Sequence, residues 1–176
     1  MYLWVLLSNF REAEYSGIQY HPLNQFKQKL IDERVTMIRK MSHATIFVKN
    51  QNDALEFYRD KLGFKVHTDA MVGDDFRWLT MCTNDQPDFE IILMEPKPGM
   101  LMDEETSNQV RALLAKGVLG AGAFNTDDCR GTYEELKAKG VEFLSEPAER
   151  FYGIEAVFRD NSGNWFSLTQ PAEGHN

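Results

Sequence analysis

An internal repeat is the feature of this sequence that most restricts its fold. The stretch His43–Val66 predicts a strand, then a helix that ends at a glycine, then a second strand. Its central part, Asn50–Gly63, returns in altered form 77 residues later as Asp127–Gly140. A repeat of this length indicates a duplicated module, because it is longer than the unit of a solenoid. Each position in one half therefore has a counterpart in the other half.

Both halves predict the same order of elements, βαβββ. In the first half, Asn50 is expected to cap the helix and Gly63 to end it. The strands expected there are 43–48, Phe64–Ala70, Phe76–Thr83 and Phe89–Glu95. In the second half we expect a strand at Leu119–Thr126, a helix at Asp127–Lys139, and strands at Val141–Leu144, Ile154–Asp160 and Trp165–Gln170.

These elements predict an α+β fold built from two modules, 42–96 and 119–171, joined by a helical connector at 97–118. Each module would present a curved sheet. The two sheets are expected to pair into an open, barrel-like cup that encloses a cavity.

Residues 1–41 do not share the repeat and are expected to form an N-terminal extension. Apolar residues from Leu23 to Ile38 recur at helical spacing, which predicts a helix. The extension is either an appended helix, with Met37 or Met41 as an alternative start, or an element that packs on a partner subunit. The apolar stretch at residues 1–10 is too short to span a membrane and lacks the features of a signal peptide.

The charge balance argues against nucleic acid as a partner. The chain has 19 Lys and Arg against 27 Asp and Glu, and the basic residues are scattered. Phosphate-binding proteins usually carry clusters of basic side chains. We therefore expect a cytoplasmic protein that binds neither nucleic acid nor membrane.

Four segments together resemble the vicinal oxygen chelate superfamily, which includes glyoxalase I, bleomycin-resistance proteins and extradiol dioxygenases. They read HATIFVKNQNDALEFYRDKLGF, DFEIILMEP, TDDCRGTYEELKAKGVEF and FRDNSGNWFSLTQ, and the resemblance covers about residues 42–171. It implies a cup of βαβββ modules that holds a divalent metal such as Ni, Zn, Mn or Fe(II). In such a site the metal binds two neighbouring oxygens of a substrate and acts as a Lewis acid.

The family's metal ligands come from the first and last strands of each module. The resemblance puts His43 and Glu90 at the two positions of the first module, and both are ligand types. The second module offers Gly120 or Ala121 and then Ser167, none of which supplies a suitable side chain. Catalytic zinc sites normally use three protein ligands, so this metal site is incomplete. A true lactoylglutathione lyase is therefore not expected.

His43 and Glu90 are also the candidate catalytic residues, because a His–Glu pair can act as a general base without a metal. The alternative is a hydrogen-bonded core histidine beside a carboxylate. The candidate substrate-binding residues are Trp78, Glu155, Tyr152 and Trp165. For the aromatic residues, core packing explains the pattern equally well, and Glu155 could be an exposed strand glutamate. His67 is expected at the surface.

Two classes of function remain open at this point. The first is a lyase, isomerase or dioxygenase, metal-assisted or acid–base, that acts on a small oxygenated molecule. The second is a protein that sequesters a small planar or aromatic molecule without chemistry, as bleomycin-resistance proteins do. The missing ligands favour binding, whereas the retained His43 and Glu90 favour an active site. The resemblance also implies a homodimer.

Overall fold

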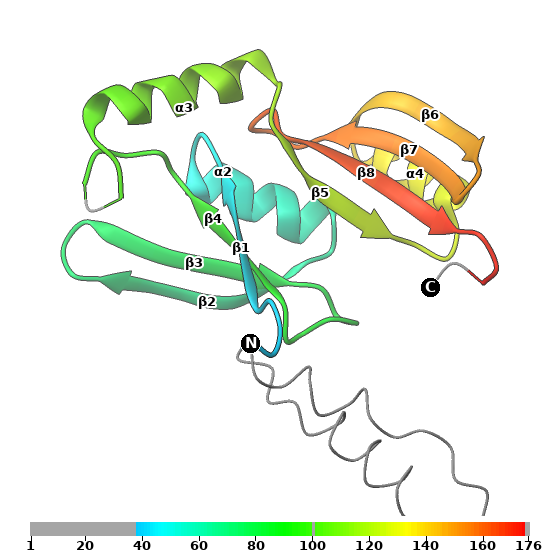
Figure 1. Ribbon diagram of the computed structural model, residues 1–176, viewed down its shortest axis with the longest axis horizontal. Helices are drawn as coiled ribbons and strands as arrows, with labels where there is room; N and C mark the ends of the chain where they lie inside the picture. Colours follow the sequence, from blue (N-terminus) through cyan, green and yellow to red (C-terminus); the bar gives the residue numbers. More distant parts are fainter. Residues whose placement is uncertain (1–37, 100, 175–176) are drawn as a thin grey trace, which may run out of the picture. The chain divides into compact units, whose positions relative to one another are not determined.

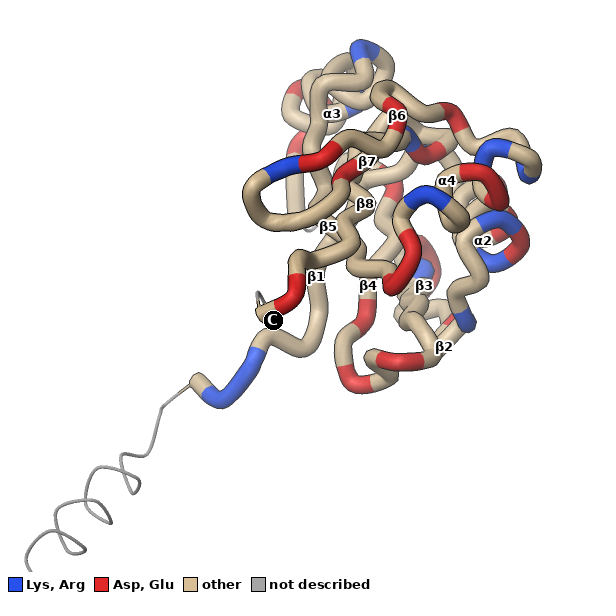
Figure 2. The backbone as a smooth tube through the Cα atoms, turned by 90° about the vertical axis from the view of Figure 1, so that its right-hand side faces the viewer, with Lys and Arg blue, Asp and Glu red and all other residues tan. Residues whose placement is uncertain are grey.

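The computed structural model describes residues 38–99 and 101–174, and residues 41–176 form one compact unit. The helix expected in the N-terminal extension falls on residues 1–37, which lie outside the described residues. None of the helices described is long and apolar enough to cross a membrane. Figure 2 shows acidic and basic residues interspersed along the backbone of the described chain.

The first module is a four-stranded sheet with a helical segment after its first strand (Figure 1). Its sheet has the order β1-β4-β3-β2, in which β1 and β4 are parallel and the other pairs antiparallel. The elements are β1 (His43–Phe47), α2 (Gln51–Glu56), a π-helical turn η1 (Phe57–Lys61), β2 (Lys65–Val72), β3 (Phe76–Cys82) and β4 (Glu90–Met94).

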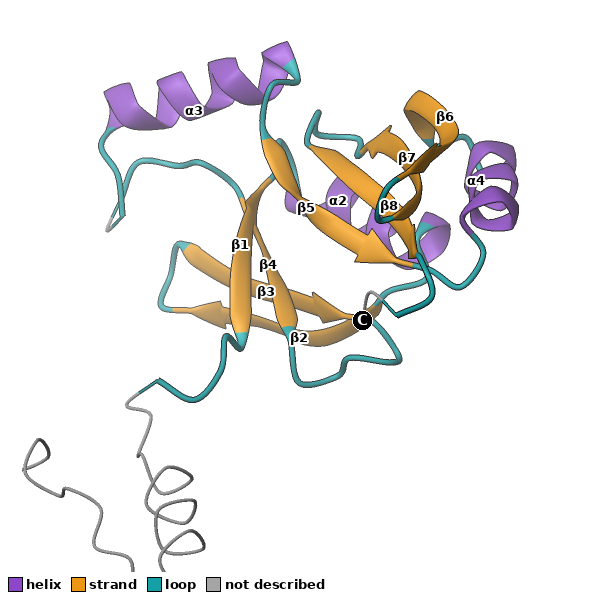
Figure 3. Ribbon diagram, turned by 45° about the vertical axis from the view of Figure 1, so that its right-hand side comes forward, coloured by secondary structure: helices purple, strands orange, loops and turns teal. Residues whose placement is uncertain are grey.

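The second module repeats this topology after the connecting helix α3 (Glu104–Lys116), as Figure 3 shows. Its sheet has the order β5-β8-β7-β6, with β5 and β8 parallel. The elements are β5 (Gly120–Asn125), α4 (Cys129–Ala138), β6 (Glu142–Arg150), β7 (Gly153–Arg159) and β8 (Trp165–Pro171). The predicted α+β fold of two βαβββ modules is confirmed.

The ends of the two module helices follow from local sequence. Asn50 accepts hydrogen bonds from the backbone of the first turn of α2, as an N-cap should. In the second module the cap is Asp128, one residue later than the 77-residue shift would place it. Gly63 and Gly140 follow the helices with φ of 76° and 74°, a left-handed conformation that side chains disfavour.

One hydrophobic core takes side chains from one face of each sheet and from the module helices. Along the strands its members alternate, as Ile46 and Val48 do, because successive strand residues point to opposite faces. Other members from the strands are Leu79, Met81, Ile91, Leu93, Ala156, Phe158, Phe166 and Leu168. We call the sheet face that points into this core the core face, and the opposite one the outer face.

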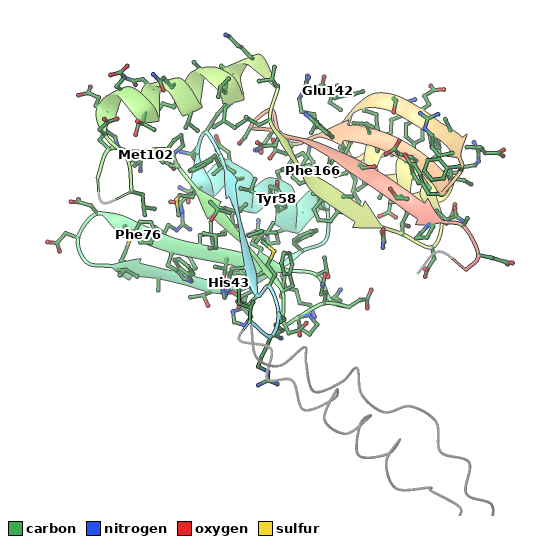
Figure 4. All side chains as sticks on the ribbon, viewed as in Figure 1. His43, Tyr58, Phe76, Met102, Glu142 and Phe166 are labelled. Atoms are coloured by element: carbon green, nitrogen blue, oxygen red, sulfur yellow. The ribbon has the colours of Figure 1, made fainter. Side chains whose placement is uncertain are left out.

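Tyr58 lies at the centre of the core and joins the two modules. Its ring packs edge-on against Phe64 of its own module and against Phe166 of the other, with centroids 5.6 and 6.4 Å away. Figure 4 shows Tyr58 and Phe166 between the two sheets, with His43 at the beginning of β1. The Tyr58 hydroxyl donates to the buried carboxylate of Asp160 at 2.9 Å. Burial, and next the charge of Asp160, hold the pKa of Tyr58 well above its usual range.

The turn 160–164 of the second module carries further hydrogen bonds to the first module. Asp160 also accepts from the backbone amides of Ser162 and Asn164 and from the Asn164 side chain. The Asn164 side chain in turn donates to the Phe47 carbonyl, and Ser162 Oγ accepts from the Lys49 amide. This turn therefore fixes the two modules to each other with polar as well as apolar contacts.

Candidate functional site

The predicted His43–Glu90 pair lies on the outer face of the first sheet. The parallel pairing of β1 with β4 sets His43 directly beside Glu90. His43 Nε2 is 3.4 Å from Glu90 Oε1, and His43 Nδ1 is 2.9 Å from Ser42 Oγ. The side chain of His43 is 37% exposed and that of Glu90 only 13%, so the imidazole partly covers the carboxylate.

His67 joins this pair, a contact that the sequence did not reveal. Its Nδ1 lies 3.1 Å from Glu90 Oε2 and 3.1 Å from Thr68 Oγ1. The pairing register of β2 with β3 slips between Val66 and Thr68, so His67 is the extra residue of a β-bulge. Bulges re-aim side chains relative to strict alternation. His67 is half exposed, as expected of a surface residue, yet it lies against the second oxygen of Glu90.

Aromatic rings continue the site along the same face. The Trp78 ring lies 5.9 Å from the His43 ring and 6.2 Å from the Phe76 ring, tilted in both cases by about 50° (54° and 51°). We call Phe76, Trp78 and His43 the aromatic row. All three residues are partly exposed, and the row ends at the carboxylate of Glu90.

The outer face of the second sheet has its own polar cluster around Glu155. Ser167 Oγ donates a short hydrogen bond to Glu155 Oε1, and Thr169 Oγ1 lies 3.2 Å from Ser167 Oγ. Arg150 Nε pairs with Glu155 Oε2 at 3.4 Å. The hydrogen bond from Ser167 is the main cause that lowers the pKa of Glu155, and the hydrogen bond to Glu155 raises the pKa of Tyr152. The predicted residues Glu155 and Tyr152 thus lie together.

Gly120, one of the two residues expected at the first-strand ligand position of the second module, lies against the ring of Trp165. The ring is so close that a Cβ at Gly120 would overlap it. β5 and β8 are parallel neighbours and pair Gly120 with Trp165, which explains the approach. Trp165 is 40% exposed, so it forms an accessible aromatic surface on this face.

The donor residues of the described chain do not fit a metal ion. Over residues 38–99 and 101–174, no three His, Cys, Asp or Glu side chains are placed so that they could hold one. His43, His67 and Glu90 come together, but each imidazole lies against a different oxygen of the carboxylate. The carboxylate therefore separates the two rings.

The predicted site residues thus fall into two groups, one on each module: Trp165 shares the outer face of the second sheet with Glu155, and Tyr152 lies in the turn between β6 and β7. Within the described residues, no hydrogen bond, ion pair or ring contact joins the cluster of His43, Glu90 and Trp78 to that of Glu155, Tyr152 and Trp165. The shared core takes the other face of each sheet. The candidate site residues on the strands therefore lie on the outer faces of the sheets, whereas the hydrophobic core of the chain is formed by the core faces.

Comparison with known proteins identifies the family of this fold. The chain matches the Glyoxalase/Bleomycin resistance protein/Dioxygenase superfamily over residues 40–168. It is 34% identical over 131 residues to YurT of Bacillus subtilis (strain 168), described as uncharacterized, which covers 74% of this chain and 98% of that protein.

Solved structures similar to this chain include UcmS2 and TnmS3. The crystal structure of UcmS2 is 47% identical and has a TM-score of 0.72, covering 76% of this chain and 98% of that chain. TnmS3, an antibiotic binding protein from Streptomyces sp. CB03234, is 26% identical with a TM-score of 0.61, covering 77% and 98%. The fold, the repeated modules and the matched residues agree: the chain belongs to the glyoxalase/bleomycin resistance protein/dioxygenase superfamily.

Proposed function

We propose that this protein binds and sequesters a small, planar, oxygenated aromatic molecule without converting it chemically. The observation that carries the proposal is the aromatic row on the outer face of the first sheet, which ends at the His43–Glu90 pair. Aromatic rings supply large contact areas and stack on planar ligands. The polar groups at the end of the row would orient the oxygens of the ligand.

The family and its members support a binding role. TnmS3 is an antibiotic binding protein with the same fold. Among residues 38–99 and 101–174, no three His, Cys, Asp or Glu side chains converge on a point where they could hold a metal ion. Binding needs only the aromatic surface and a few fixed polar atoms, and the outer face supplies both.

The proposal includes a homodimer in which the first module of one copy faces the second module of the other. A concave site needs two walls to bury most of a ligand. Among the described residues of one chain, no hydrogen bond, ion pair or ring contact joins the aromatic row to Glu155 or Trp165, and the core face of each sheet is already used. A two-fold dimer would bring two such pairs of walls together and form two equal cups.

A thermal-shift screen of fused-ring aromatic compounds, followed by calorimetric titration of the best hit, tests this function. We expect at least one hit and a loss of affinity of about thirtyfold in Trp78→Ala, the loss typical of a central aromatic contact. Met71→Ala is the matched control, because Met71 is exposed on the neighbouring strand β2 and lies outside the aromatic row. A complete lack of hits, or equal affinity in Trp78→Ala, would contradict the proposal.

A second candidate function is acid–base catalysis of a lyase or isomerase type. The observation that favours it is the contact of two imidazoles with the single carboxylate of Glu90. Its test is hydrogen–deuterium exchange at an acidic C–H of a bound hit, followed by NMR in D2O. Catalysis would be established if the wild type exchanges this hydrogen for deuterium and the His43→Ala or Glu90→Gln variant does not. If the ligand shows no exchange with the wild type over the same time, the protein only binds it.

A metal-assisted dioxygenase or lyase is tested separately, by titration of the purified protein with Ni, Zn, Mn and Fe(II). Because the imidazoles lie against different oxygens of Glu90, we expect no stoichiometric binding. One metal ion per chain, bound in the wild type and lost in His43→Ala, would restore the metal-assisted function.

A further inference from the structure

We propose that Nε2 of His67 is the hydrogen-bond acceptor of this site, and that the ligand class is therefore a planar aromatic compound with a hydroxyl group that donates to it. The inference rests on the proposed function and names its ligand more closely. It uses a residue that neither the sequence pattern nor the predicted ligand positions single out.

His43 is the first of the two histidines beside Glu90 whose ring proton has to be placed. An ionised carboxylate accepts hydrogen bonds and cannot donate them. We assign the ring proton of His43 to Nε2, because this nitrogen lies 3.4 Å from Glu90 Oε1 and an N–H there points toward the carboxylate. His43 Nδ1 then accepts from the Ser42 hydroxyl at 2.9 Å. Both nitrogens of His43 are thus already engaged, so the ring of His43 can stack on a ligand but has no nitrogen left to accept from it.

His67 differs from His43 in this respect. Its Nδ1 lies between Glu90 Oε2 and Thr68 Oγ1, both at 3.1 Å. We assign the ring proton of His67 to Nδ1, because the Glu90 carboxylate can only accept a hydrogen bond, whereas the Thr68 hydroxyl can either donate or accept one. Nε2 is then left with its lone pair and has no hydrogen-bond partner among the described residues. The side chain is 48% exposed, so a ligand can reach this nitrogen.

The position of His67 links this acceptor to the aromatic row. The His43 ring packs on Trp78 and faces one oxygen of Glu90, while His67 lies against the other oxygen. A fused-ring compound that stacks on Trp78 can therefore place one edge against the tilted ring of His43 and extend toward His67. The negative charge of Glu90 disfavours a carboxylate on that edge, whereas a phenolic hydroxyl supplies the donor that Nε2 lacks.

Titration with beta-naphthol and with its methyl ether measures this preference. The two probes share the ring, but only the naphthol can donate a hydrogen bond. In the wild type we expect five- to tenfold tighter binding of the naphthol, about what one net hydrogen bond supplies. His67→Phe keeps an aromatic ring and removes the acceptor, so both probes should bind it equally. Met71→Ala is the matched control and should keep the wild-type ratio.

A second measurement reads the tautomer of His67 without any ligand. Two-bond ¹⁵N–¹H correlation spectra at about pH 8, above the ordinary imidazole pKa of about 6.5, should show a proton on Nδ1 and a bare Nε2. The His67→Phe spectrum assigns the signal. Beta-naphthol should then shift the Nε2 resonance, and its methyl ether should not.

These experiments can contradict the role of His67 without contradicting the proposed binding function. Equal affinity of the wild type for the two probes, a ratio that survives in His67→Phe, or a proton on Nε2 would each overturn the role of His67 alone. Failure of both probes to bind the wild type at all would overturn the proposed function, and the inference with it.

Discussion

On the outer face of the first sheet, β1 contributes His43 and β4 contributes Glu90, whereas the equivalent strands of the second sheet hold Gly120 and Ser167. The two modules have the same strand order and the same helix position. In the second module the ring of Trp165 covers the position of the missing histidine, and the carboxylate comes from Glu155 on the neighbouring strand β7.

This difference shows which face of a duplicated module is constrained by folding. The centres of both core faces are apolar, since both belong to one core around Tyr58, and polar residues such as Arg77 and Gln170 lie at their margins. Nothing in that packing fixes the residues on the outer faces. One outer face carries a His–Glu pair, and the other carries a hydroxyl–carboxylate cluster together with an exposed tryptophan.

The largest expected difference between the modules concerns the turn between their last two strands. Asp160 is buried and accepts four hydrogen bonds, including that of Tyr58 in the other module. Asp160→Ala leaves buried donors without acceptors, so we expect the free energy of unfolding to fall by about 3 kcal/mol. Asp85→Ala, in the exposed turn of the first module, should change it by less than about 0.5 kcal/mol. Urea denaturation measures both, and similar losses would contradict the asymmetry.

A smaller effect is expected where the Trp165 ring covers Gly120. Gly120→Ala forces the half-exposed ring to move, which should cost about 1 kcal/mol of unfolding free energy. In a Trp165→Ala background the same substitution should cost close to nothing, because the obstructing ring is gone. Urea denaturation of the four proteins gives the coupling. A coupling of zero would mean that Trp165 is not the reason for a glycine at this position.

How far the site could be predicted differs between the two modules. The fold followed from periodicity, from the Asn50 cap and from glycines at the helix ends, which are local signals. The His43–Glu90 pair was also predictable, because the first and last strands of a βαβββ module are parallel neighbours. His67 was missed since a bulge breaks the alternation on which strand patterns depend.

In the second module Glu155, Tyr152 and Trp165 were named as candidates, but the contact of Glu155 with Ser167 was missed, for a different reason. The repeat aligns Glu155 with Trp78, and so gives no hint that its partner is Ser167. A contact between neighbouring strands depends on their pairing register, and the sequence of one strand does not contain that register.

The smallest expected effect is the pH dependence that Glu155 contributes. Its folded-state pKa is lowered, first by the hydrogen bond from Ser167, so the unfolded chain binds the proton more tightly. This contribution to stability is present above the ordinary glutamate pKa of about 4.3 and is lost as the pH falls through the lowered folded pKa. Denaturation midpoints measured from pH 6 to pH 3, roughly the range around that ordinary pKa, should fall further in the wild type than in Glu155→Gln or Ser167→Ala. Parallel curves would contradict the role of this hydrogen bond.

The central claim is that the first module of one copy and the second module of another form each cup, and mixing two variants tests it directly. The variants Trp78→Ala and Trp165→Ala should each bind the aromatic compound weakly, because each substitution removes one of the two tryptophans from both cups of the dimer. After exchange of subunits, about half of the dimers should be mixed, and each of these should contain one cup with both tryptophans intact. The account predicts that about a quarter of all sites regain wild-type affinity. No recovery on mixing, or wild-type affinity in Trp165→Ala alone, would contradict it.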